Sequence, residues 1–186
     1  MVFNVVVGRF QIFTIGHLRM LEEVRRLSVN SNLVIVLGSA QESGTAGNPF
    51  SADERETIIG PALNSAGISA QFRRINDVGN YPVWARRLVE EVIGTDDIIV
   101  YGGEDSSALK ACAGIGIRTV PLENYYKDSR LPKKRISAGY VGDLICANNP
   151  KWMECVPREI AVALMTDDGH GKTRIDKIKE ARRIIC

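Results

Sequence analysis

The stretch VFNVVVGRFQIFTIGH, residues 2–17, decides which fold the chain adopts. It opens with an apolar run over residues 2–7 that has the length and the Val-rich composition of a buried strand. A Gly-Arg pair follows at once, and Gly16 and His17 come where we expect a helix to begin. A strand, a glycine-bearing turn and a helix in this order are typical of the first unit of an open parallel α/β sheet.

The same alternation continues along the chain. Short runs rich in Val and Ile predict further strands, and the longer stretches between them predict the helices that connect parallel strands. The predicted strands are residues 2–7, 32–37, 68–75, 97–101 and 118–122, and the predicted helices are residues 17–28, 52–66, 82–93 and 106–115. The expected fold is α/β: a Rossmann-like, doubly wound, parallel five-stranded sheet with a helical C-terminal extension.

One helix start is marked in detail. In the sequence Ser51-Ala52-Asp53-Glu54, the serine can cap the helix, and Glu54, three residues later, can return a bond to the cap amide. We therefore place the beginning of the second helix at this point.

Length and charge limit the organisation of the chain and its partners. With 186 residues, 45% of them hydrophobic, the chain can bury one good core, so we expect a single domain over residues 1–186, with a core at 1–124 and a basic loop and C-terminal helices at 125–186. Ile175, Ile178, Arg182 and Ile185 recur at helical spacing in the last of these helices. The formal charge of +2 argues against nucleic acid or an anionic membrane as the main partner.

The cysteines and histidines do not form a metal-binding pattern. The four cysteines contain no CxxC pair and the chain has two histidines, so we predict no protein metal site and free thiols in a reducing cytoplasm. The apolar run at residues 2–7 is far shorter than the roughly 20 residues that a membrane helix needs. We expect a cytoplasmic protein.

The turn after the first predicted strand carries the chemistry. Gly8 lets the backbone approach a phosphate, Arg9 supplies a fork of donors, and Gly16 and His17 stand where the free amides of a helix start favour negative charge. On spacing alone, a phosphate cradle and a plain strand-to-helix turn are equally good readings.

Four segments resemble a known family. Gly-Arg-Phe-Gln followed by Thr14-Ile15-Gly16-His17 is similar to the first signature of the HxGH nucleotidyltransferase superfamily. The segment GSAQESGTAGNPFSADER, residues 38–55, resembles the archaeal type of nicotinamide-mononucleotide (NMN) adenylyltransferase. The segment INDVGNYPVW, residues 75–84, is similar to that family's nicotinamide-binding stretch, and Lys151-Trp152 with Val156-Pro157 resembles its W-x-x-[LC]-V-P run.

The resemblance implies a reaction and a set of site residues. NMN and ATP would be the substrates and NAD and pyrophosphate the products of a direct in-line adenylyl transfer, with Mg²⁺ held mainly through the ATP phosphates. The residues implied are His17 and Thr14 for catalysis; Gly8, Arg9, Phe10, Gly16 and Ser137 for ATP; and Asp77, Asn80, Tyr81 and Trp84 for NMN. We add Lys134 and Arg135 to the ATP set as a hypothesis, because they stand directly before the second signature. Trp84 is expected to stack on the nicotinamide ring, and Trp152 to be structural.

The chain departs from the family pattern in three places. The second signature, IS-x-T-x-x-[RK], falls at residues 136–142, where Gly139 replaces the usual Thr and Gly142 the basic residue that grips the ATP phosphates. The basic run at residues 133–135 could supply that charge. Thr14 replaces the first His of HxGH, and Gly44 stands where many archaeal members have a His. The Gly-Lys-Thr at 171–173 lacks the earlier glycine of a Walker A loop, so His170 is expected in a loop.

Two alternatives stay open at this point. The chain could be another nucleotidyltransferase, acting on nicotinate mononucleotide or transferring a cytidylyl group. Because the second signature is altered, it could also be a non-catalytic nucleotide-binding sensor. Assembly into a homo-oligomer is left open by the sequence.

Overall fold

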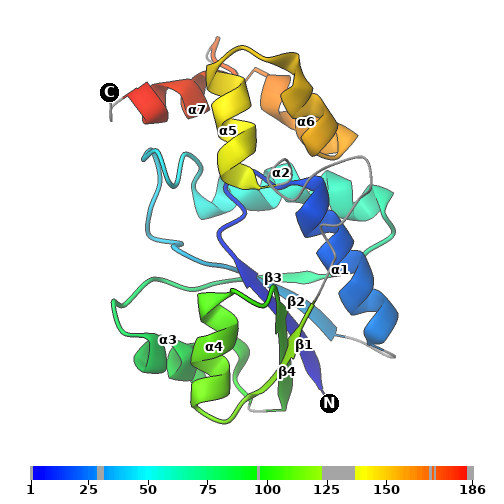
Figure 1. Ribbon diagram of the computed structural model, residues 1–186, viewed down its shortest axis with the longest axis vertical. Coiled ribbons are helices and arrows are strands. Elements are labelled where there is room, and N and C mark those ends of the chain that lie inside the picture. The colour runs from blue at the N-terminus through cyan, green and yellow to red at the C-terminus, as the bar shows by residue number, and fades with distance from the viewer. Residues whose placement is uncertain are drawn as a thin grey trace. The chain divides into compact units, whose positions relative to one another are not determined.

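The computed structural model describes residues 2–28, 32–95, 97–122, 137–167, 169 and 171–183. Its strands form one five-stranded, all-parallel sheet in the order β3-β2-β1-β4-β5 (Figure 1). The strands are β1 (Phe3–Gly8), β2 (Asn32–Leu37), β3 (Gln71–Arg74), β4 (Ile98–Gly102) and β5 (Arg118–Pro121). This is the doubly wound Rossmann-like sheet that the sequence predicts.

The helices follow the strands in the expected alternation and continue beyond the sheet. They are α1 (Ile15–Leu27), α2 (Ala52–Ser65), α3 (Tyr81–Arg87), the π-helix η1 (Leu88–Ile93), α4 (Ser107–Gly114), α5 (Ala138–Cys146), the 3₁₀-helix η3 (Pro150–Cys155), α6 (Arg158–Met165) and α7 (Arg174–Arg183). None of the helices in the described segments is both long and apolar enough to cross a lipid bilayer.

The chain divides into two compact units. The first unit comprises residues 1–9, 20–41 and 68–125, and the second comprises residues 10–19, 42–67 and 126–186. The expectation of a single domain stays a prediction. The two units are described one after the other below.

The first unit contains the whole sheet and two layers of packing. Alternate strand residues point to one face, where they form a buried cluster with α3, η1 and α4; its members include Val5, Val34, Val36, Val100, Trp84, Leu88 and Leu109. The residues one position along, Val6 and Ile35, are fully buried on the opposite face. The part of α1 that belongs to this unit lies across the strands from α4 (Figure 1).

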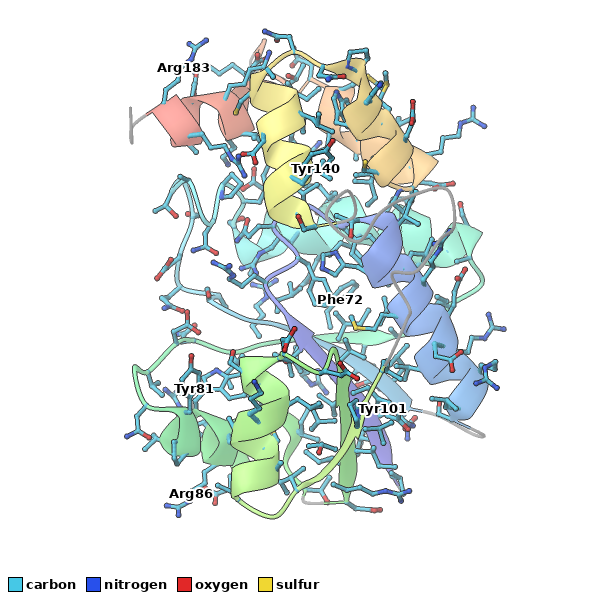
Figure 2. The ribbon with its side chains drawn as sticks, in the orientation of Figure 1. Phe72, Tyr81, Arg86, Tyr101, Tyr140 and Arg183 are labelled. Carbon is cyan, nitrogen blue, oxygen red and sulfur yellow. The ribbon has the colours of Figure 1, made fainter. Side chains whose placement is uncertain are left out.

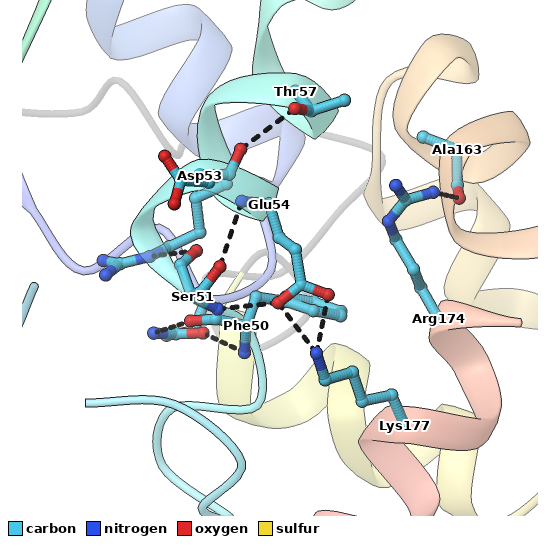
Figure 3. A network of polar contacts seen from close by, with 10 residues as sticks. Phe50, Ser51, Asp53, Glu54, Thr57, Ala163, Arg174 and Lys177 are labelled. Atoms are coloured by element: carbon cyan, nitrogen blue, oxygen red, sulfur yellow. Dashed lines mark hydrogen bonds and ion pairs between the residues drawn. The ribbon is translucent and has the colours of Figure 1, made fainter. Parts of the chain in front are cut away.

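The second unit is a helical cluster in which α2 packs on α6, and α5 and α6 both contact α7. The capping box of α2 forms as predicted: the Glu54 amide donates to Ser51 Oγ at 3.2 Å and the Ser51 amide to Glu54 Oε2 at 2.9 Å. Lys177 of α7 donates to both Glu54 oxygens, at 2.6 and 2.8 Å (Figure 3). Burial alone would raise the pKa of Glu54, but the bonds from Lys177 and Ser51 hold that pKa below its usual value. The carboxylate therefore ties α7 to the start of α2.

Three elements differ from the prediction by more than one residue at an end or in the type of helix. The strand predicted at 68–75 shrinks to Gln71–Arg74, because Ile68 and Ile75 are buried outside the paired stretch of an exposed edge strand. The helix predicted at 82–93 changes to π-helical geometry at Leu88. Helix α1 begins two residues earlier than predicted, because Thr14 caps it.

Some residues named in the sequence analysis lie outside the described part of the chain. They are Lys134, Arg135, His170 and Ile185.

The capping box gives a stability prediction. Replacing Ser51 by Ala leaves the Glu54 amide without its acceptor, so Ser51→Ala should lower the free energy of unfolding by about 1 kcal/mol. Urea unfolding followed by circular dichroism measures this. An unchanged midpoint would contradict the role given to the cap.

Candidate functional site

A cavity of about 660 Å³ opens in the first unit at the carboxyl ends of the strands. Its walls come from the end of β1, the turn after β2, the loop and first helical turn after β3, and the start of α4. The lining residues are Val7, Gly8, Arg9, Gly38, Ser39, Asp77–Tyr81, Trp84 and Asp105–Ala108. Strand β1 and the segment that follows β4 both contribute, and the strand order reverses between these two neighbouring strands. This is the place where open α/β sheets bind their ligands.

All four residues predicted to bind NMN line this cavity. Asp77 is the most firmly placed of them. Ser39 Oγ donates to Asp77 Oδ2 at 2.6 Å, and the Asp77 amide donates to Gln41 Oε1 at 3.1 Å. Ser39 itself is buried and has a positive φ of 47°, a backbone conformation that few residues other than glycine adopt. This conformation orients the Ser39 hydroxyl towards Asp77. The Asp77 carboxylate is thus a fixed acceptor on the cavity wall.

The other three predicted NMN residues sit at the start of α3. Asn80 caps this helix, with its Oδ1 accepting from the Val83 amide at 3.1 Å. Trp84 is 8% exposed and belongs both to the cavity lining and to the hydrophobic cluster beneath it. Tyr81, labelled in Figure 2, is 63% exposed. The structure thus gives Asn80 and Trp84 a structural contact in addition to their place at the cavity.

Asp105–Ala108 form a wall of the cavity that was not predicted from the sequence. Ser106 caps α4 by accepting from the Leu109 amide at 3.3 Å, so this wall is the first turn of a helix. The predicted helix at 106–115 marked the start of this turn, but nothing in the sequence tied it to the cavity.

The predicted catalytic pair lies in the second unit, where the ring of His17 is held by Thr14. The Thr14 amide donates to His17 Nδ1 at 3.0 Å, and Thr14 Oγ1 lies 3.2 Å from the same nitrogen. The His17 amide in turn donates to Thr14 Oγ1 at 3.4 Å. Because a backbone N–H can only donate, Nδ1 must be the acceptor, and the proton of the neutral ring resides on Nε2.

Aromatic neighbours keep this imidazole neutral. The Phe10 ring packs edge-on against it with centroids 5.1 Å apart, and Phe13 lies at 5.5 Å. Burial among these groups lowers the pKa of His17 from 6.5 to about 4. At neutral pH the side chain is therefore a neutral N–H donor.

Two residues predicted to bind ATP lie close to this pair in the sequence. Phe10 is buried and has a positive φ of 48°, and Gly16 lies in the first turn of α1.

Gln11 is a buried residue of this loop to which sequence reasoning gave no role. Its Oε1 accepts from the Phe50 amide at 2.9 Å, while its Nε2 donates to Asn48 Oδ1 at 3.1 Å and to the Phe50 carbonyl at 3.2 Å. Asn48 donates in turn to Glu42 at 2.5 Å. One amide therefore joins the GRFQ and NPF segments. The only sequence signal for this contact was that the GRFQ and NPF segments both belong to the family pattern.

The remaining predicted ATP residue in the described chain is Ser137. It caps α5, with its Oγ accepting from the Tyr140 amide at 3.2 Å. Among the described residues, no group of three or more His, Cys, Asp or Glu side chains could hold a metal ion.

The neutral His17 gives a prediction on stability. Its folded-state pKa is depressed, so its contribution is full above pH 6.5 and is lost as the pH falls towards about 4. Between pH 7 and pH 5, the wild type should lose on the order of 2 kcal/mol more unfolding free energy than His17→Gln, which cannot titrate. Urea unfolding of both proteins at both pH values measures the difference. Equal losses would show that the ring is not held neutral.

Comparisons with known proteins were made by sequence and by fold. The family model described as Cytidylyltransferase-like matches residues 5–104. Nicotinamide-nucleotide adenylyltransferase 1 of Sulfolobus acidocaldarius is 31% identical over 177 residues, covering 90% of this chain and 91% of the relative. The nicotinamide-nucleotide adenylyltransferase of Sulfurisphaera tokodaii is 31% identical over 156 residues, covering 82% and 84%.

Solved structures share the fold. A bifunctional NMN adenylyltransferase/ADP ribose pyrophosphatase from Francisella tularensis, complexed with AMP and a Mn ion, superposes with a TM-score of 0.69 at 18% identity. The match covers 98% of this chain but 53% of that protein, so the chain spans about half its length. Taken with the sequence matches, these findings show that the chain belongs to the nicotinamide-nucleotide adenylyltransferase family, among the Cytidylyltransferase-like proteins.

Proposed function

We propose that this protein joins NMN to ATP and releases NAD and pyrophosphate. The observation that carries the proposal is His17, a neutral imidazole whose ring is fixed by Thr14 so that Nε2 must donate. A fixed neutral donor at the start of a helix suits a reaction whose charge develops on phosphate oxygens.

The chemistry needs no nucleophile from the protein. A 5′-phosphate oxygen of NMN attacks the α-phosphorus of ATP, a new P–O bond forms, and the bond to the β-phosphate oxygen breaks in line. The electron pair leaves with pyrophosphate. Such a transfer depends on holding two polyanions together and on stabilising the charge that builds on the leaving oxygen, so positioning and electrostatics supply the rate.

The loop after β1 performs that work in this account. His17 Nε2–H donates to an ATP phosphate oxygen, and Thr14, which is 1% exposed and engaged with His17, acts mainly by positioning the ring. The Gly8 backbone and Arg9 hold the nucleotide, and Phe10 and Gly16 shape the loop. Ser137, Lys134 and Arg135 complete the proposed ATP contacts.

The divalent ion is proposed to be Mg²⁺, which would be held mainly through the ATP phosphates rather than by protein side chains. When bound it neutralises part of the triphosphate charge, as Mg²⁺ commonly does with few protein ligands. The protein groups act beside it by donating hydrogen bonds.

The cavity of the first unit is the proposed NMN site. The Asp77 carboxylate can accept from the N–H₂ of the nicotinamide carboxamide, and Trp84 offers a surface for the ring. A carboxylate in that place would repel the carboxylate of nicotinate mononucleotide. We therefore propose NMN as the preferred acceptor, in the cytoplasm.

A coupled assay for NAD formed from NMN, ATP and Mg²⁺ tests the function. CTP in place of ATP, and nicotinate mononucleotide in place of NMN, are the controls for the other transferases. NAD synthesis with both natural substrates supports the proposal. Calorimetry that detects ATP or NAD binding beside no NAD synthesis would support the non-catalytic sensor instead.

His17 should be indispensable for rate. Removing one preorganised donor costs about 100-fold in turnover, so His17→Ala should lower kcat at least that far. Steady-state assays at saturating ATP and NMN measure it, with circular dichroism to check folding. Turnover within threefold of the wild type would remove His17 from the mechanism.

Asp77 should govern the affinity for NMN. A lost hydrogen bond to a charged group corresponds to roughly a tenfold change, so Asp77→Ala should raise KM for NMN about tenfold and leave KM for ATP nearly unchanged. Ser39→Ala, which only releases the carboxylate, should produce a smaller rise. Equal effects on both substrates would contradict this assignment.

A further inference from the structure

Two glycines, at the places where the chain departs from the family's second signature, lie on one face of α5. Gly139 and Gly142 are three residues apart, so they are neighbours on the helix surface. Neither bears a side chain, and this leaves the backbone of the first turns of α5 open along that face.

The guanidinium of Arg182, from α7, lies on this face. Its Nη2 donates to the Gly139 carbonyl at 3.3 Å, and its Nη1 donates to Asp143 Oδ1 at 2.5 Å. All these residues belong to the second unit. Arg182, which is 40 positions after Gly142 in the sequence, therefore contacts one residue inside the altered signature and the residue that directly follows it.

Gly142 is the residue that makes room for it. A Cβ atom added at Gly142 would overlap the guanidinium of Arg182, with Nη2, Cζ and Nε as its three nearest atoms. Any side chain at position 142 would have to displace Arg182. The glycine at 142 and the arginine at 182 are thus a matched pair.

Arg182 is placed as an oriented cation at the surface. Its side chain is 25% exposed and that of Asp143 is 73% exposed, so the ion pair is largely solvated and orients the guanidinium more than it stabilises the fold. A guanidinium carries five N–H donors, and the two bonds within the described residues use two of them. The guanidinium therefore has further N–H donors for an anionic ligand.

We propose that Arg182 binds the ATP phosphates in place of the basic residue that the family pattern carries at position 142. The proposal rests on the adenylyl transfer proposed above and adds to it the source of the missing cation. The charge then comes from α7 rather than from α5, and the guanidinium lies on the face of α5 that carries Gly139 and Gly142. The altered second signature is then a relocation of one phosphate ligand, with Gly142 as its structural requirement.

The test compares ATP parameters in a charge swap. Arg182→Ala should lower kcat/KM for ATP at least about tenfold, the scale of a hydrogen bond to a charged group, with KM for NMN within twofold of the wild type. Adding Gly142→Arg to that variant fills the vacated space with the same charge and should restore kcat/KM to within about threefold. Lys179→Ala, which removes another α7 cation bonded at 2.6 Å to Asn148, is the matched control and should change neither value.

Other outcomes would overturn the proposal. Unchanged ATP parameters in Arg182→Ala would do so, as would a loss that Gly142→Arg fails to restore, since that marks a purely structural role. If Arg182→Ala does not fold, Arg182→Gln keeps two donors without the charge and must show the same ATP defect. Calorimetric titration with ATP and Mg²⁺ distinguishes failure of the proposed function from failure of this inference. A wild type that binds ATP but makes no NAD refutes the function. A folded Arg182 variant that binds ATP as tightly as the wild type refutes the inference alone.

Discussion

The hydrogen bond from the Thr14 amide to His17 Nδ1 is the constraint on which the account of the site depends. It fixes the tautomer, because a backbone amide cannot accept, and it leaves Nε2–H as the donor of the neutral ring. The surrounding rings of Phe10 and Phe13 remove water and keep the imidazole neutral. The Thr that replaces the first histidine of HxGH is thus compatible with a well-oriented second one.

Local signals explain why most of the fold could be predicted. Hydrophobic runs and the capping box at Ser51 depend on neighbours in the sequence, so the alternation of strands and helices along the chain and the start of α2 follow from them. The edge strand β3 was overestimated because Ile68 and Ile75 are buried for tertiary reasons. The change to π-helical geometry at Leu88 carries no sequence signal that we could identify.

The family pattern names residues of the candidate site, but contacts between distant parts of the chain could not be predicted from it. Asp77 and Trp84 both line the cavity, and the bond from Ser39 that fixes Asp77 spans 38 positions. The contacts of Gln11 with Phe50 and of Arg182 with Gly139 likewise join residues that are far apart in the sequence. Such contacts depend on the folded backbone, and no spacing rule reveals them.

The central claim is that His17 acts as a neutral Nε2–H donor to ATP, and ¹⁵N NMR of its imidazole tests this most directly. Spectra at pH 7 should show a protonated Nε2 and an unprotonated Nδ1 before and after ATP and Mg²⁺ are added, with the Nε2 proton moving downfield on addition. A ring protonated on both nitrogens, or a resonance that ATP leaves unmoved, would contradict the account.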